Sequence, residues 1–208
     1  MSNVYYILDN EEETGPYTLE ELNQLDIDIH TKILSPKTGA WESAGDLPDL
    51  YPLFEARGIY LPTGDNLASF GWRFLAFVVD YIVLIFLMNF VMNALALGGM
   101  KLNFTSYTEL MKMPKQMIIL QLIFHGTFIV YNTICEFSPM KGSLGKKLCR
   151  MVVVDANGDG LNFPNALLRS VGKSVSIFLC YLGFLSIFFT EHKQAVHDQL
   201  AKTYVVKL

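Results

Sequence analysis

The sequence is poor in cysteine and carries none of the common catalytic or metal-binding patterns. Its 3 cysteines are odd in number and widely spaced without a CxxC pair, so we expect reduced thiols at Cys135, Cys149 and Cys180. The chain contains no HExxH, no GxSxG and no paired intramembrane aspartate motif. We therefore expect no enzyme activity, no cofactor and no metal, and we expect no nucleic-acid partner.

Basic residues are rare in the first third of the chain. Residues 1–65 hold 13 Asp and Glu against 3 Lys and Arg, a net charge of −10, whereas the remainder carries +6. Two modules of opposite character are therefore joined, and Pro, Gly and polar residues gather at 61–66 as they do in linkers. We predict a soluble acidic domain at 1–57, a linker at 58–70 and a membrane domain at 71–208. The N-terminus lacks a basic segment followed by an apolar one, so we expect no signal peptide and a cytosolic acidic domain.

The acidic domain has the pattern of a small α+β fold. Residues 5–8 predict a short strand, and residues 31–35 predict a second one. Between them Thr18 precedes a helical stretch at 19–25, with Glu21 at the capping-box position. Trp41 follows as a large aromatic anchor, so the module is complete within about 50 residues.

Three ordered segments of this domain carry a family resemblance: YYILDNEEETGPYTLEEL, ILSPKTGAW and SAGDLPDL. Over residues 4–55 they resemble the GYF-2 type of small adaptor domain found in bacterial membrane proteins. In the related eukaryotic GYF domains an aromatic surface takes proline-rich peptides, because a pre-extended polyproline helix loses little entropy on docking. The resemblance implies a cytosolic protein or a proline-rich peptide as partner. The candidate contacts are Tyr5, Tyr6, Tyr17 and Trp41, and the alternative is that these aromatics form the core of the domain.

The whole chain is 51% hydrophobic with a mean hydropathy of +0.31, and its long apolar runs lie in the second part. The run from Trp72 to Leu97 is long enough to cross the roughly 30 Å hydrocarbon core of a bilayer. It contains Arg73 and Asp80, although a charge at mid-depth costs about 2.5–3.5 kcal/mol. Being seven residues apart, the two lie within about 20° of one helix face. Arg73 can snorkel to lipid phosphate, and Asp80 serves either an ion or proton path or a buried interhelical hydrogen bond.

A second span is predicted at about Gln116 to Glu136, with a polar stripe along it. Four polar residues fall within about 60° of one another around this helix: Gln121, His125, Asn132 and Glu136. The stripe needs water or polar partners, since each unpaired polar group in hydrocarbon costs several kcal/mol. We expect it to face Asp80 and to place His125 beside that carboxylate as a titratable pair. The alternative for His125 is a hydrogen bond between helices.

Charge and strand patterns after the second span set the topology. The segment Lys141–Arg150 holds four basic residues and no acid, so it is predicted to be cytoplasmic, with the loop 98–115 outside. A third apolar segment, Ser174 to Phe189, is short for a perpendicular span. If Val152–Val154 pairs with a strand at 202–207, the C-terminus is cytosolic and the third segment is a re-entrant helical hairpin. Otherwise it is a plain third span with an outside C-terminus.

An ordered set of motifs in the second module carries another resemblance. Trp72 to Asp80, the Gly142–Leu148 segment leading into Val152–Asp155, then Arg169, and Val196–Val206 together resemble the RDD family of small membrane proteins, over about residues 68–208. The family is named for one Arg and two Asp, which the resemblance maps onto Arg73, Asp80 and Asp198. It implies transport of ions or small ligands.

The fold class we predict is an α-helical integral membrane domain of two or three spans with a small cytosolic β element, fused to a small α+β soluble domain. We expect transport of cations, protons or a small ligand through a polar path lined by Arg73, Asp80, Gln121, His125, Asn132, Glu136 and Asp198. A homo-oligomer is expected, because two or three helices enclose little volume. The alternative is a membrane-anchored adaptor whose head recruits a cytosolic partner and whose buried polar groups are structural. We predict a bacterial inner-membrane location.

Overall fold

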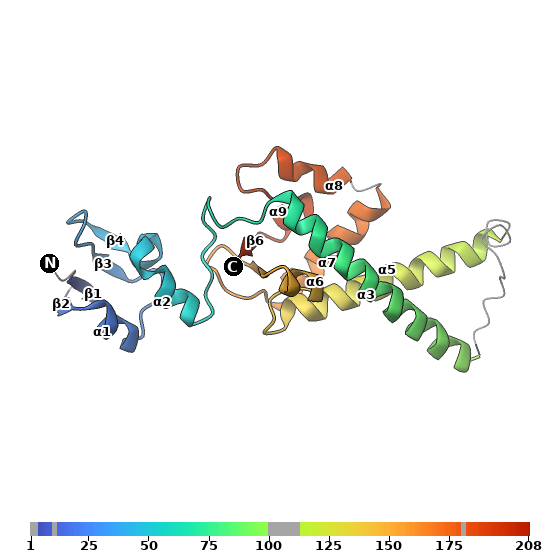
Figure 1. Ribbon diagram of the computed structural model, residues 1–208, viewed down its shortest axis with the longest axis horizontal. Helices are drawn as coiled ribbons and strands as arrows, with labels where there is room; N and C mark the ends of the chain where they lie inside the picture. Colours follow the sequence, from blue (N-terminus) through green and yellow to red (C-terminus); the bar gives the residue numbers. More distant parts are fainter. Residues whose placement is uncertain (1–3, 10–11, 100–112, 180–181) are drawn as a thin grey trace. The chain divides into compact units, whose positions relative to one another are not determined.

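The computed structural model describes residues 4–9, 12–99, 113–179 and 182–208 (Figure 1). By internal contacts the chain divides into two compact units. The first is Met1–Leu61 with Asn157–Asp159, and the second is Pro62–Ala156 with Gly160–Leu208. Most of the predicted loop at 98–115, and Cys180, lie outside the described residues.

The N-terminal unit is built on a four-stranded antiparallel sheet in the order β2-β1-β3-β4. Its strands are β1 (Tyr5–Asp9), β2 (Glu12–Tyr17), β3 (Lys32–Leu34) and β4 (Trp41–Ser43). In the register, Ile7 lies opposite Ile33, and both are buried. Alternation along the strands therefore turns one face of the sheet to the core.

Short helices complete the core of this unit. They are α1 (Leu19–Gln24), the 3-10 turns η1 (Ala44–Asp46) and η2 (Pro48–Leu50), and α2 (Tyr51–Ala56). The predicted capping box of α1 is confirmed: Glu21 N donates to Thr18 Oγ1 at 3.3 Å, and Thr18 N donates to Glu21 Oε2 at 2.8 Å. Leu22 of α1 and Phe54 of α2 are fully buried in the core.

In the part of the second unit that the structure describes, two helices are long and apolar enough to cross a membrane: α3 (Phe70–Leu97) and α5 (Pro114–Phe137). Their outward residues are large and apolar, with Phe86, Phe90 and Leu122 strongly exposed. A helix that is apolar all round and largely unburied by its own chain is typical of a membrane span. The predicted fold class is confirmed, with an α+β domain joined to two or three membrane-length helices.

The third apolar segment consists of α7 (Phe163–Phe178), α8 (Leu182–Leu185) and the 3-10 turn η3 (Ser186–Phe188). The directions of α7 and of residues 182–188 differ by 111°. A change of direction this sharp is typical of a broken span or a re-entrant segment. A straight third span would have no such bend.

Short elements gather where α3 begins and α5 ends (Figure 1). They are α6 (Leu144–Leu148), β5 (Met151–Val154), α9 (Val196–Leu200) and β6 (Tyr204–Lys207). The predicted strand pairing is confirmed, since β5 and β6 are antiparallel with Val152 opposite Val206. Because β6 returns to β5, the chain between them leaves and re-enters the same end of the domain. That return favours the re-entrant hairpin over a plain third span.

The chain just before α3 is part of this small sheet. Leu67 bridges to Val206, and Ala68 N donates to Val205 O at 2.8 Å. Both Leu67 and Ala68 are buried. These residues of the predicted 58–70 linker therefore belong to the packed membrane unit.

Candidate functional site

Buried charged side chains converge where α3 begins and α5 ends. The carboxylates Glu136 of α5 and Asp198 of α9 are both 0% exposed. Each of them contacts more than one cationic side chain. Burial of an isolated ionised carboxylate costs much free energy. The neighbouring cations therefore allow Glu136 and Asp198 to stay ionised.

Three cations surround Glu136. Its Oε1 accepts from Arg169 Nη1 at 2.6 Å, from Lys146 Nζ at 2.8 Å and from Lys173 Nζ. Arg169 and Lys173 are four residues apart on α7, so both lie on the helix face that meets α5. Lys146 comes from α6, so three elements meet at this one oxygen.

Asp198 is held by two arginines. Arg73 Nη1 donates to its Oδ2 at 2.5 Å, while Arg169 Nε donates to Oδ1 at 2.9 Å and Arg169 Nη2 contacts the same oxygen. The backbone N–H of Ala195 adds a further bond at 3.1 Å. Because Arg169 binds both Asp198 and Glu136, it joins α9 to α5.

The electrostatics of Asp198 follow from these contacts. Burial by itself would raise the pKa of the Asp198 carboxyl, but the surrounding groups together, with the Arg169 guanidinium the largest of them, outweigh burial and hold that pKa well below its usual value. Burial also lowers the pKa of the neighbouring His197 to about 3. His197 is therefore neutral at pH 7, and the two arginines supply the compensating charge.

Asp80 has a different environment from the ion pairs. Its Oδ1 accepts from Tyr131 Oη at 2.7 Å and from Gly145 N at 2.8 Å, and its Oδ2 accepts from Ser143 Oγ at 2.5 Å. Asp80 thus fastens α3 to α5 and to the start of α6. This is the interhelical hydrogen bonding that was one of the two alternatives for Asp80.

Gly145 is required at this contact for steric reasons. A Cβ on Gly145 would lie 2.1 Å from the backbone oxygen of Ala76 and 2.9 Å from Asp80 Cγ. Only the absence of a side chain lets the α6 backbone approach α3 closely enough to donate to Asp80.

The polar stripe of α5 faces α7, and the expected His125–Asp80 pair is wrong. His125 Nδ1 lies 2.6 Å from Ser174 Oγ, and Asn132 Oδ1 accepts from Lys173 Nζ at 3.1 Å. Gln121, nearer the start of α5, is exposed. The physical reason is that α7 offers its own polar face, so the stripe finds its partners there.

Several residues of the site were not among the sequence candidates: Tyr131, Ser143, Gly145, Lys146, Arg169 and Lys173. Two of them had a usable signal, because the spacing of Arg169 and Lys173 puts two cations on one helix face of an apolar segment. Tyr131 gave none, since a tyrosine in an apolar helix is equally suited to packing. Among the described residues no group of three or more His, Cys, Asp or Glu is placed to hold a metal.

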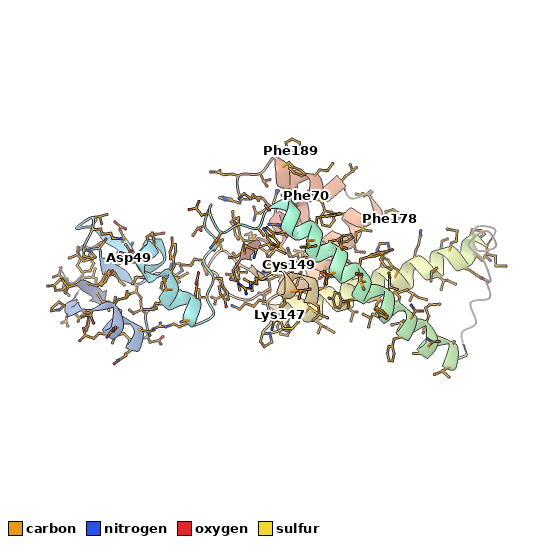
Figure 2. The ribbon with its side chains drawn as sticks, in the orientation of Figure 1. Asp49, Phe70, Lys147, Cys149, Phe178 and Phe189 are labelled. Atoms are coloured by element: carbon orange, nitrogen blue, oxygen red, sulfur yellow. The ribbon has the colours of Figure 1, made fainter. Side chains whose placement is uncertain are left out.

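A cavity of about 290 Å³ lies next to the charged cluster. Its polar wall consists of Arg73, Asp80, Asn132, Lys146, Arg169, Lys173 and His197. Its apolar wall comes mainly from α3 and α8 and begins at Phe70, which is labelled in Figure 2. The ring of Phe70 lies 4.8 Å from that of Phe188, so η3 covers this end of α3.

The aromatic candidates of the N-terminal unit fall into two groups. Tyr5 is 2% exposed and belongs to the core. Tyr6 and Trp41 both lie opposite Leu34 in the sheet, so the three share the face that is turned away from the core. Tyr17 is half-buried and packs against the core from β2.

Comparison with known proteins agrees with both sequence resemblances. The family model described as RDD family matches residues 67–202, and the model described as GYF domain 2 matches residues 5–50. Uncharacterized protein YxaI of Bacillus subtilis (strain 168) is 30% identical over 146 residues, which are 67% of this chain and 96% of that protein. Human protein FAM8A1 is 26% identical over 168 residues, and the match spans 67% of this chain but 40% of FAM8A1. No solved structure matches the chain.

Proposed function

Because this chain belongs to the RDD family, as an integral membrane protein with buried polar residues, we propose that its membrane domain transports protons, small cations or a small ligand along the polar contacts between α5 and α7. The observation that carries the proposal is the succession of polar contacts along α5 and α7: His125 with Ser174, then Lys173 with Asn132 and Glu136, and then Arg169 with Glu136 and Asp198.

The extent of this series supports a role across the bilayer. His125 and Glu136 are eleven residues apart, which is about 16 Å along a helix at 1.5 Å per residue. That length is about half of the roughly 30 Å hydrocarbon core. Chains of ionisable groups at membrane depth are typical of proton relays and ion pathways, since a buried charge without a function is costly.

The other half of the path would need a second contributor. Beyond His125, Gln121 is exposed on α5 and its neighbours are apolar. A second copy of the chain packed against this face would supply polar groups and enclose a pathway. We therefore include a homo-oligomer in the proposal.

The proposed orientation puts the N-terminal unit, and the end of the membrane domain that carries the charged cluster, on the cytosolic side of a bacterial inner membrane. Lys147 and Arg150 of the basic segment are exposed at the end of the domain where α6 lies. Exposed basic residues beside a span favour the cytoplasmic side.

A second function is favoured by the N-terminal unit. The match to GYF domain 2 suggests proline-rich peptide binding, and Tyr6, Leu34 and Trp41 form a partly exposed face on its sheet. Aromatic rings on such a face provide flat surfaces for a polyproline helix. An adaptor head and a transporting membrane domain are compatible in one chain.

Ion flux into proteoliposomes tests the transport proposal. Wild type, His125→Gln and Asp80→Asn would be compared for H⁺, Na⁺ and K⁺ flux, with Asn89→Leu as control. Asn89 is a polar residue of α3 whose side chain, within the described ranges, donates only to Ile85 O of its own helix. We expect flux in wild type and in Asn89→Leu, and loss in His125→Gln, which keeps hydrogen bonding but cannot titrate.

Flux that survives His125→Gln would exclude His125 from the path, and flux that survives Asp80→Asn would leave the Asp80 carboxylate with its structural role alone. Wild-type vesicles that move none of the three ions would refute cation and proton transport. The adaptor function would then be tested by binding of proline-rich peptides to the full chain.

A further inference from the structure

The cavity beside the charged cluster has the size of a small ligand site. Its volume of about 290 Å³ is near the lower limit of common ligand pockets, roughly 300 Å³, and corresponds to about ten water molecules at roughly 30 Å³ each. It lies within the membrane unit, with α3 on one side and α7, α8 and α9 on the others. The two walls of this cavity differ in chemistry.

The polar wall has unused hydrogen-bond donors and a surplus of positive charge. Arg73 Nε donates to Ala68 O at 3.1 Å and its Nη1 to Asp198, but its Nη2 is buried and has no hydrogen-bond partner among the described residues. The Arg73 side chain is only 10% exposed and lines the cavity. A buried guanidinium N–H pair without an acceptor is costly and calls for an anionic oxygen.

The neighbouring charges do not cancel this preference for an anion. Four basic side chains, those of Arg73, Lys146, Arg169 and Lys173, pair with the carboxylates of Glu136 and Asp198. Asp80 also lines the cavity, but both of its oxygens already accept hydrogen bonds from Tyr131, Ser143 and Gly145. Counted by formal charge, the cluster therefore holds four basic and three acidic side chains.

The apolar wall opens toward the region where lipid chains would lie. Phe74 and Leu185 line the cavity, yet they are 55% and 48% exposed on the outside of the membrane unit. Phe74 belongs to a membrane span, so its outer side faces hydrocarbon. A ligand that entered here from the bilayer would place its polar group at the polar wall and its apolar part against the apolar wall.

We propose that this cavity binds an anionic amphiphile from the membrane, with a carboxylate or phosphate head on Arg73 and an acyl chain against α3 and α8. The cavity shares Asn132, Arg169 and Lys173 with the α5–α7 contacts proposed for transport, but binding of the amphiphile does not require that transport take place. Charge-assisted hydrogen bonds from Arg73 fix the head, and burial of the chain against aromatic side chains adds affinity.

Equilibrium binding to the purified full-length protein in neutral-lipid nanodiscs tests this site. The probe is radiolabelled oleate, and the competitors are unlabelled oleate, an acyl glycerol phosphate, monoolein and inorganic phosphate. Saturable oleate binding, displaced by the acyl glycerol phosphate but not by uncharged monoolein or by phosphate, is the expected result. Equal displacement by monoolein would overturn the anion requirement, and equal displacement by phosphate would make this a free-anion site.

Two substitutions place the binding in this cavity. Leu185→Trp fills its mouth, whereas Leu182→Trp adds the same ring one turn away on α8, at an exposed residue that does not line the cavity. We expect Leu185→Trp and Arg73→Lys to weaken oleate binding about tenfold, through lost space and a lost charge-assisted bond respectively.

Leu182→Trp should bind oleate like wild type, and all three variants are checked for an unchanged thermal unfolding midpoint. Arg73→Lys alters the ion pair with Asp198 and can destabilise the protein. If Arg73→Lys unfolds, the comparison of Leu185→Trp with Leu182→Trp tests the location of the site. Equal affinity in Leu185→Trp and wild type would overturn the assignment to this cavity.

Discussion

The close approach of α6 to α3 at Gly145 gives a sharp test of how the membrane unit is held together. Gly145→Ala would place a Cβ 2.1 Å from Ala76 O, a backbone atom that cannot move aside without shifting α3. The start of α6 must therefore retreat, which breaks the bond from Gly145 N to Asp80 Oδ1. Overpacking costs about 1–3 kcal/mol, and loss of a hydrogen bond to a charged group costs about 1.5–3 kcal/mol.

We accordingly expect Gly145→Ala to lower the free energy of unfolding by about 3–5 kcal/mol. The measurement is denaturant or thermal unfolding of the purified protein in one detergent, followed by tyrosine and tryptophan fluorescence. Gly126→Ala is the matched control: it lies on α5, and a Cβ there has no heavy atom within 4 Å. In a helix interior that change should be neutral or stabilise by up to about 1 kcal/mol.

An unfolding free energy of Gly145→Ala within about 0.5 kcal/mol of wild type would refute the reasoning. It would mean that α6 does not pack on α3 as described and that Asp80 does not depend on the Gly145 N–H. A large loss in Gly126→Ala would instead point to a general intolerance of added methyl groups.

Three further outcomes follow from the contacts. Arg169→Met leaves two buried carboxylates short of a partner and should cost about 3–5 kcal/mol of unfolding free energy, whereas the exposed Arg150→Met should change it by less than about 0.5 kcal/mol. The pKa of His197 is about 3 in the folded protein and about 6.5 in the unfolded chain. The contribution of His197 to the free energy of unfolding is therefore fully present above pH 6.5 and falls by about 2 kcal/mol on acidification to pH 5. A pH series of unfolding curves should show this slope in wild type and lose it in His197→Gln. Trp41→Ala should weaken binding of a proline-rich peptide to the full chain about tenfold in a fluorescence titration, because Trp41 lies with Tyr6 and Leu34 on the outer face of the sheet. Tyr51→Ala should bind the peptide like wild type, because Tyr51 lies on α2 and not on that face.

Local features of the fold could be predicted because neighbouring residues encode them. The capping box of Thr18 and Glu21 and the two long apolar runs depend on side chains within one or two turns of each other. The pairing of β5 with β6 was also predictable, since both strands are short valine-rich runs that need a partner. Family motifs placed Arg73, Asp80 and Asp198 among the candidates.

The partners of these candidates could not be predicted in the same way. Arg73 and Asp80 lie on one helix face, yet Arg73 binds Asp198 of α9 while Asp80 binds Tyr131 of α5. Which distant element packs on a helix depends on tertiary packing, and helical periodicity carries no information about it. Lys146 illustrates the same limit, because its charge was counted only as a topology signal although it is buried against Glu136.

The bond between Arg73 and Asp198 has a consequence for how the protein is made. The two residues are 125 positions apart, so α3 is synthesised well before α9. Glu136 likewise waits for Arg169 and Lys173 of α7. The first two helices thus emerge from the ribosome with charges that stay unmatched until α7 and α9 have been made.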